Sequence, residues 1–227
     1  MKIREEENKV IIDGIEDFHL DHTFDNGQCF RWNREEDGSY TGVAFGRTLN
    51  ISSKGSAVIL DNVSREEYHA LWKKYLDLSR DYGSIKRMLS AKDEAMSRAI
   101  AYGGGMRVLQ QDPWETLISF ILSQNNNIIR IKKCVESLCA AHGTPIGTYR
   151  GAMRYAFPTP EALAELNPED LSPCRLGYRA KYIVETAKQV VCDGGRALES
   201  METATAEEAM EYLLTMSGVG PKVANCI

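Results

Sequence analysis

The sequence predicts an α+β protein, with an N-terminal antiparallel β-sheet domain followed by a helical domain. Up to about residue 61, short runs rich in β-branched and aromatic residues alternate with turn signals, which is typical of antiparallel strands. From Ser64 onwards, helix-capping patterns and helical spacing of apolar residues take over. We expect residues 1–108 to form the sheet domain with flanking helices, and residues 109–227 to form the helical domain.

The strand predictions rest on five runs, which cover residues 10–15, 29–32, 40–45, 49–51 and 57–60. Three of the intervening turns are marked by the pairs Asp13-Gly14, Asp37-Gly38 and Lys54-Gly55. Glycine favours such turns because it accepts the positive φ that tight connections require.

The helix predictions rest on N-terminal signals, which are capping boxes at Ser64–Glu67 and Thr205–Glu208 and X-Pro starts at Asp112, Thr159 and Asn167. The helix from Pro113 to about Ser123 is apolar nearly all round, so it should run through the core. The next helix is amphipathic and should end at His142-Gly143. Its core face is predicted to hold Ile128, Ile131, Val135 and Leu138.

Composition limits the classes of protein that fit. No run is long and apolar enough to span a membrane, and the N-terminus has neither a secretory nor a transit signal, so we expect a cytoplasmic protein, nucleoid-associated if prokaryotic. The six cysteines contain no C-x-x-C pair, which argues against a zinc site or a disulfide framework. The net charge of −5 excludes a broad basic surface but not local basic patches, such as those at residues 130–133 and 175–181.

The most informative segment is the last fifteen residues. Gly218-Val-Gly220 is a tight turn, and Pro221 suits the first position of a new helix. Two helices therefore meet at a turn whose free N–H groups can bind an anion. Lys222 lies in the first helical turn, where the helix dipole disfavours a cation. That placement indicates a neutral amine acting as a nucleophile, although in non-catalytic DNA-binding proteins the same lysine contacts a phosphate.

Three further motifs each leave two interpretations open. Gly27-Gln-Cys-Phe-Arg-Trp32 is either a strand start with a half-buried aromatic pair or a place where backbone approaches a flat ligand. Ser123-Gln-Asn-Asn-Asn127 is either a capped turn between helices or a source of amides that replace a base. Leu176-Gly-Tyr-Arg-Ala-Lys-Tyr182 opens a helix with Tyr178 and Arg179 exposed, for stacking on an unpaired base or for helix packing.

Taken in order, with Gln110-Gln-Asp-Pro113 between the first two, these motifs resemble the 8-oxoguanine DNA glycosylase/AP lyase family of the helix-hairpin-helix superfamily. The resemblance covers nearly the whole chain. Endonuclease III and adenine-glycosylase types lack such an N-terminal sheet domain, and the alkylpurine type lacks the lysine nucleophile.

The resemblance implies a bifunctional base-excision repair enzyme. It would flip 8-oxoguanine out of double-stranded DNA, remove it through a lysine Schiff base, and cleave the strand by β-elimination. It would prefer lesions opposite cytosine, act as a monomer, and need no cofactor, with no metal in the catalytic chemistry.

The resemblance also implies roles for individual residues. Lys222 matches the nucleophile, Gly27 matches the glycine whose carbonyl accepts the N7–H of 8-oxoguanine, and Cys226 matches a cysteine beside the flipped base. The DNA contacts are Asn125 in the gap left by the flipped base, Arg130 and Arg179 on the orphaned cytosine, Tyr178 as a wedge, and Gly218, Val219 and Gly220 on a phosphate.

One departure from the family stands out. The family's catalytic aspartate and a C-terminal helix that contacts the base would both fall beyond Ile227. We therefore expect a fragment that binds DNA weakly and turns over inefficiently by itself. The alternatives are a non-catalytic DNA-binding module and an inactive, truncated helix-hairpin-helix protein.

Overall fold

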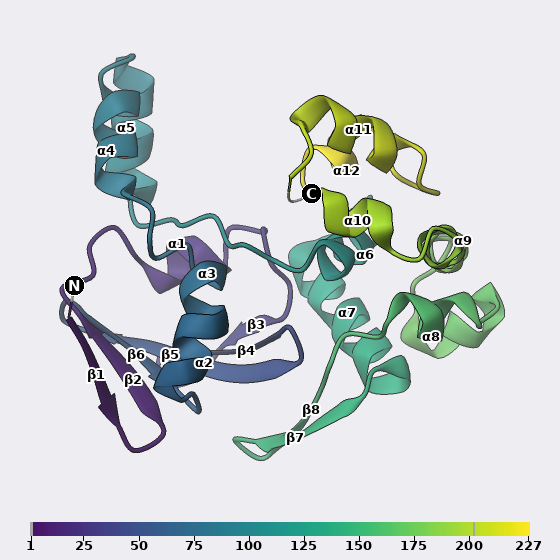
Figure 1. Ribbon diagram of the computed structural model, residues 1–227, viewed down its shortest axis with the longest axis horizontal. Coiled ribbons are helices and arrows are strands. Elements are labelled where there is room, and N and C mark those ends of the chain that lie inside the picture. Colours follow the sequence, from purple (N-terminus) through teal and green to yellow (C-terminus); the bar gives the residue numbers. More distant parts are fainter. Residues whose placement is uncertain (1, 202) are drawn as a thin grey trace. The chain divides into compact units, whose positions relative to one another are not determined.

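The computed structural model describes residues 2–201 and 203–227 (Figure 1). The chain divides into two compact units, one of Met1–Val43 with Thr48–Gln110 and the other of Ala44–Arg47 with Gln111–Ile227. The first unit ends at Gln110, and the second includes the short segment Ala44–Arg47 from within the sheet region.

A six-stranded antiparallel sheet forms the N-terminal part, as the sequence predicts. Its spatial order is β1 (Lys2–Glu6), β2 (Lys9–Asp13), β6 (Ala57–Asp61), β5 (Arg47–Lys54), β4 (Tyr40–Ala44) and β3 (Trp32–Arg34). The three predicted turn glycines have φ values of +70°, +78° and +60° at Gly14, Gly38 and Gly55. Each therefore adopts the left-handed conformation for which glycine is favoured.

The core of the first unit is aromatic as well as aliphatic. Trp32 stacks on Phe24 with ring centroids 4.4 Å apart, and its indole Nε1 donates to the hydroxyl of Tyr75 at 2.7 Å. Gly42 lies opposite Trp32 in the β3–β4 register, and a Cβ at Gly42 would lie 2.3 Å from the indole ring. The indole thus fits only because its cross-strand neighbour has no side chain.

Four strands differ from the sequence-based prediction. β1 and the separate hairpin β7 (Pro145–Tyr149) and β8 (Ala152–Tyr155) were not predicted. β1 is largely exposed and reads Lys-Ile-Arg-Glu-Glu, so it shows little apolar alternation; a sheet edge needs only backbone pairing. The predicted strand at residues 29–32 was also wrong, because strand geometry begins only at Trp32.

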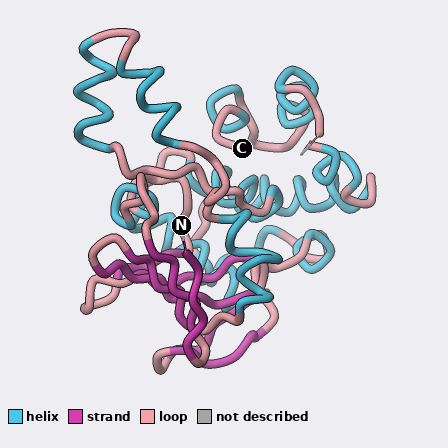
Figure 2. Tube along the Cα trace, turned by 60° about the vertical axis from the view of Figure 1, so that its left-hand side comes forward, coloured by secondary structure: helices cyan, strands magenta, loops and turns pink. Residues whose placement is uncertain are grey.

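The helices of the first unit are short, apart from one pair. α1 (Leu20–Phe24) precedes the Gly27 motif, and α2 (Arg65–Glu67), η1 (Tyr68–Trp72) and α3 (Lys73–Tyr75) follow one another without a break. α4 (Tyr82–Ser90) and α5 (Glu94–Gly103) form a helical hairpin, seen as two neighbouring cyan coils in Figure 2. Neither α4 nor α5 has a buried residue.

The second unit is helical around a central helix. α6 (Pro113–Ser123) has the predicted bounds, and Leu117, Ile118, Ile121 and Leu122 are fully buried. The other helices are α7 (Ile128–His142), α8 (Pro160–Ala164), η2 (Pro168–Cys174), α9 (Arg179–Cys192), α10 (Arg196–Ser200), α11 (Ala206–Leu214) and α12 (Pro221–Ala224). Among the described residues, none of the helices has the length and apolar character to cross a membrane.

α7 departs from its predicted pattern at its first turn. Ile131, Val135 and Leu138 are buried as expected, but Ile128 is 42% exposed. Its neighbour Ile129 is 72% exposed. Periodicity predicts burial in the middle of a helix, whereas at the first residue no preceding turn completes the cover.

Candidate active site

α11 and α12 form a hairpin (Figure 1). Gly218 lies in the segment that connects the two helices. A complete capping box, Thr205 with Glu208, opens α11 as predicted. Gly218 has a φ of +76°, and a Cβ there would lie 2.6 Å from the ring of Tyr182. Gly220 is the N-cap of α12 at φ −105°, and a Cβ there would meet nothing within 4 Å. Sterically, the turn therefore requires glycine at position 218, whereas position 220 has room for a side chain.

Side chains of α9 hold the hairpin turn. The hydroxyl of Thr186 donates to the carbonyl of Ser217 at 3.0 Å, and the Ser217 hydroxyl donates to Glu185 at 2.5 Å. Gln189 makes two bonds, accepting from the Ser217 N–H and donating to the Thr215 carbonyl, both at 3.1 Å. These contacts fix the backbone just before Gly218.

Lys222 lies in the first turn of α12, four residues after Gly218, and its side chain is exposed. Within the described residues, Lys222 is therefore open to solvent. Val223 and Ala224, on the other side of α12, are buried. Cys226 is exposed, and its thiol donates to the Lys222 carbonyl at 3.3 Å, so it lies one turn beyond the lysine.

The turn between α6 and α7 assigns different tasks to its three asparagines. Asn127 caps α7, its side chain accepting from the Arg130 N–H at 3.0 Å, and Asn126 donates to the Leu122 carbonyl at 3.0 Å. Asn125 is exposed at a φ of +46°, and its side chain makes no hydrogen bond within residues 2–201 and 203–227. The capped-turn interpretation therefore accounts for Asn126 and Asn127 and leaves Asn125 available.

Tyr178 and Arg179 differ sharply in exposure. Tyr178 is 54% exposed, as predicted, but Arg179 is only 3% exposed, so its predicted exposure was wrong. The guanidinium donates to the carbonyls of Gln124 (2.9 Å from Nε, with a second bond from Nη2), Asn125 (3.0 Å) and Leu176 (3.3 Å). It also stacks 4.5 Å from the centre of the Tyr178 ring.

The physical reason for this burial is the demand for hydrogen-bond donors. The tight turn after α6 leaves the carbonyls of Gln124 and Asn125 without helical partners. A guanidinium offers five N–H donors in a planar fork and can satisfy several carbonyls at once. The sequence marks Arg179 as part of a motif but carries no signal for which carbonyls need it.

Gln124 was missed by the sequence reading as a site residue. Its side-chain Nε2 donates to the Gly218 carbonyl at 2.7 Å and to the Ile121 carbonyl at 3.2 Å. The second unit thus connects the predicted DNA contacts around Asn125, Tyr178 and Arg179 to the hairpin of Lys222. Arg130 is exposed in the first turn of α7, as expected for a DNA contact.

Gly27 belongs to the first unit, where it lies in the turn between α1 and β3 at a φ of +86°. Its neighbour Gln28 fixes this turn. The Gln28 amide donates to the carbonyls of Thr23 (2.7 Å) and Arg107 (2.8 Å) and accepts from the Leu109 N–H (3.0 Å). The backbone at Gly27 is therefore held by a chain segment about eighty residues further along the sequence.

The side chains in the described residues that can bind a metal ion or react as thiols are His, Cys, Asp and Glu for a metal, and the six cysteines for thiol chemistry. Within the described ranges, no group of three or more His, Cys, Asp or Glu side chains could hold a metal ion. All six cysteines are free, and only Cys192 and Cys226 are exposed. Burial raises the pKa of the Cys174 thiol above its ordinary value, which keeps it protonated.

Two family models match the chain in succession. The model described as "8-oxoguanine DNA glycosylase, N-terminal domain" matches residues 10–117, and "HhH-GPD superfamily base excision DNA repair protein" matches residues 118–223. Together they account for both the sheet and the hairpin.

Two curated relatives are named as N-glycosylase/DNA lyases. The chain is 45% identical over 133 residues to an N-glycosylase/DNA lyase of Saccharomyces cerevisiae, covering 54% of this chain and 35% of that protein. It is 32% identical over 213 residues to N-glycosylase/DNA lyase OGG1 of Arabidopsis thaliana, covering 90% of this chain and 58% of that protein. The chain thus spans only part of the length of these relatives.

Solved structures match over nearly the whole chain. MBOgg1 in complex with a low-affinity DNA ligand has a TM-score of 0.94 at 47% identity, covering 99% of this chain and 77% of that one. Clostridium acetobutylicum 8-oxoguanine glycosylase/lyase, in complex with double-stranded DNA containing cytosine opposite 8-oxoG, has a TM-score of 0.95 at 40% identity, covering 100% and 77%. With both family models matched in order and this fold shared at such identity, the chain belongs to the 8-oxoguanine DNA glycosylase family.

Proposed function

We propose that this chain carries the core of a bifunctional DNA glycosylase/lyase, which removes 8-oxoguanine from duplex DNA during base-excision repair. The observation that carries the proposal is the placement of Lys222. Its amine is accessible in the first turn of α12, on a hairpin whose turn is fixed by α9 and by Gln124. A lysine in such a position has the chemistry of a Schiff-base nucleophile.

The reaction begins with the damaged base turned out of the duplex, because the glycosidic bond cannot be reached inside the stack. The neutral Lys222 amine attacks the sugar C1′ as the C1′–N9 bond breaks, and the departing purine takes up a proton. One of the two protons on the nitrogen passes to O4′ as the C1′–O4′ bond breaks, which opens the sugar ring and leaves a protonated Schiff base between Lys222 and C1′. Removal of a C2′ proton then expels the 3′ phosphate by β-elimination.

Recognition of the damaged base is assigned to Gly27 and Cys226. The Gly27 carbonyl is an acceptor suited to the N7–H that distinguishes 8-oxoguanine from guanine, and a glycine permits close approach of a flat base. The Cys226 thiol lies one turn beyond Lys222, so it is close to the point of attack.

Recognition of the opposite strand is assigned to the surface around Asn125. Cytosine that has lost its partner offers O2 and N3 acceptors, which suit an arginine fork. Arg130 is exposed for this contact, whereas Arg179 is buried and has four of its five N–H donors on carbonyls, which leaves it one N–H on Nη1 for the cytosine. Tyr178 is exposed for stacking beside the gap, and the backbone of Gly218, Val219 and Gly220 would hold a phosphate.

The test is excision from a defined substrate. A duplex with one 8-oxoguanine opposite cytosine is incubated with the full-length protein that carries this sequence, and free base is measured by mass spectrometry beside strand cleavage. We expect release of 8-oxoguanine and a cleaved strand, with no release from a matched duplex containing guanine. Tight binding without release would instead identify a non-catalytic DNA-binding module.

A further inference from the structure

One side chain joins the turn after α6 to the turn of the hairpin. Gln124 is the C-cap residue of α6 and comes directly before Asn125. Its amide donates to the Gly218 carbonyl, 94 residues further along the chain, at 2.7 Å. The residue next to Asn125 therefore holds the turn that precedes Lys222.

Arg179 holds the main chain of the same residue, Gln124. The main-chain carbonyl of Gln124 accepts from both Nε and Nη2 of the guanidinium, and the Asn125 carbonyl accepts from Nη2 at 3.0 Å. The guanidinium is buried beneath the exposed Tyr178 ring. Any movement of Tyr178 or Arg179 therefore displaces the backbone from which the Gln124 side chain extends.

The hairpin turn is poorly able to absorb such a displacement. Gly218 is in the left-handed region against the ring of Tyr182, with no room for even one more carbon atom. Thr186 and Gln189 hold the residues just before it. Because packed segments move as units, a shift at Gly218 is passed on to α12.

We infer that Gln124 is a positioning residue, which couples recognition of the base opposite the lesion to the placement of Lys222. This inference rests on the proposed function, in which the Asn125 turn meets the opposite strand and Lys222 performs the chemistry. A cytosine that fits the turn leaves the hydrogen bonds from Arg179 to the Gln124 backbone, and from the Gln124 side chain to Gly218, intact. An opposite base that fits badly displaces the carbonyls of Gln124 and Asn125 and slows the attack by Lys222. Selectivity for the opposite base then appears in the chemical step as well as in binding.

The test compares two variants of the full-length protein under single-turnover conditions with saturating protein. Gln124→Met keeps the length of the side chain and removes the N–H donor. Gln124→Glu places a carboxylate oxygen, which is an acceptor, against the carbonyls of Gly218 and Ile121. Excision rates are measured for 8-oxoguanine opposite cytosine and opposite adenine, beside the dissociation constants for both duplexes. We expect the ratio of the two rates to fall about fivefold, the worth of one hydrogen bond, while the ratio of the dissociation constants is unchanged.

Gln189 provides the matched control, because it holds the same hairpin from α9 without a hydrogen bond to the Asn125 turn. Gln189→Glu should lower both rates together and leave their ratio unchanged. A wild-type protein that excises but shows no rate ratio, or Gln124 variants that keep the wild-type ratio, would overturn the inference. A wild-type protein that excises nothing would overturn the proposed function instead, and melting temperatures show that each variant is folded.

Discussion

The turns at Gly27 and Gly218 each depend on a glutamine side chain, Gln28 at the first and Gln124 at the second. Gly27 has a φ of +86° and is followed by Gln28, and Gly218 has a φ of +76° and accepts from Gln124. Gln28 uses both ends of its amide, on Thr23, Arg107 and Leu109, all in the first unit. Gln124 uses its Nε2 for the hairpin while its own backbone is gripped by Arg179.

The two glutamines differ in whether their bonds only stabilise a turn or also link two segments with proposed functions. The Gln28 bonds join the backbone around Gly27 to a chain segment that carries no proposed chemical role, so they stabilise the turn. The Gln124 bonds join two segments that both have proposed roles, one on the opposite base and one in the attack. Hydrogen bonds from a glutamine amide therefore stabilise one turn in the first unit, whereas in the second unit they connect two segments with proposed roles.

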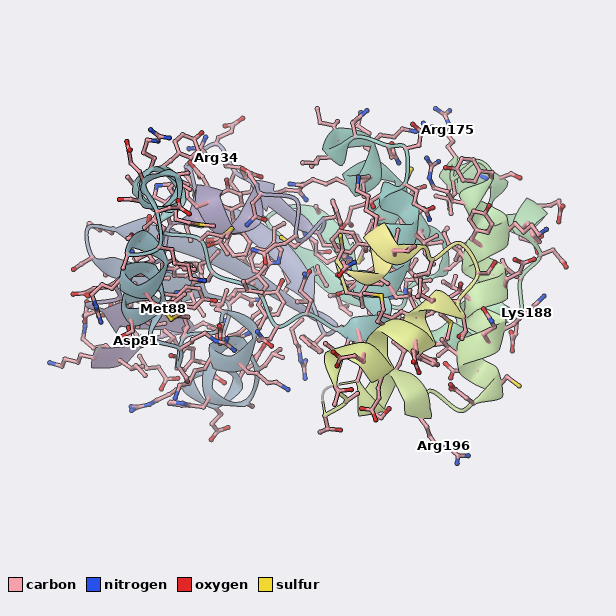
Figure 3. The ribbon with its side chains drawn as sticks, turned by 90° about the horizontal axis from the view of Figure 1, so that it is seen from above. Arg34, Asp81, Met88, Arg175, Lys188 and Arg196 are labelled. Carbon is pink, nitrogen blue, oxygen red and sulfur yellow. The ribbon has the colours of Figure 1, made fainter. Side chains whose placement is uncertain are left out.

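The largest effect should fall on chemistry at the second turn alone. Lys222→Gln removes the nucleophile and should abolish strand cleavage, while the Gly27 turn continues to favour DNA with 8-oxoguanine over undamaged DNA in binding assays. Lys188, which points to solvent from α9 in Figure 3, supplies the control, and Lys188→Gln should keep full activity. Cleavage that persists in Lys222→Gln would remove this lysine from the mechanism.

The next effect concerns the steric demands of the hairpin turn. Gly218→Ala forces a Cβ against Tyr182 at a positive φ, and we expect it to lower the free energy of unfolding by about 3 kcal/mol. Gly220→Ala, where a Cβ meets open space, should change it by less than about 0.5 kcal/mol. Urea unfolding measures both, and equal losses would show that the clash is relieved by a small movement of Tyr182.

The two glutamines should differ in what their loss does to stability. Gln28→Leu leaves two carbonyls and one N–H without partners and should lower the free energy of unfolding by about 2 kcal/mol. Gln124→Met removes the hydrogen bonds to two carbonyls but leaves no N–H without an acceptor, and it should lower the free energy of unfolding by about 1 kcal/mol. If Gln124→Met proves the more destabilising, Gln124 is primarily an anchor and the contrast between the two turns is lost.

The smallest effect should appear at the exposed edge of the opposite-base surface. Arg130→Ala removes an arginine fork and should reduce the preference for cytosine over adenine by about 1 kcal/mol in competition binding. Lys133 is an exposed cation on the same helix, so Lys133→Ala should weaken binding to both duplexes alike. An equal loss of preference in the two variants would mean that Arg130 contributes charge rather than base recognition.

Much of the fold could be predicted, because local signals determine it. Glycines at turns, proline at the start of α6 and the capping box at Thr205 each act within a few residues, and the structure confirms them. β1 and β7–β8 were missed because exposed edges pair through the backbone, which leaves little trace in side-chain patterns. Ile128 was misplaced because helical periodicity says little about the cover of a first turn.

The candidate site could be predicted in its motifs but not in its connections. Asn125 and Tyr178 are exposed as expected, since each stands at a turn or helix start. The burial of Arg179 and the bridge made by Gln124 depend on carbonyls that become unpaired only in the folded chain. Such demands arise between segments far apart in sequence, where local patterns carry no information.

The most direct test of the central claim is to identify the residue that joins the DNA. The full-length protein is reduced with borohydride during reaction with a duplex carrying 8-oxoguanine opposite cytosine, and the trapped adduct is digested and sequenced by mass spectrometry. We predict a sugar remnant on the nitrogen of Lys222. A remnant on any other amine, or no adduct from protein that has released the base, would contradict the account.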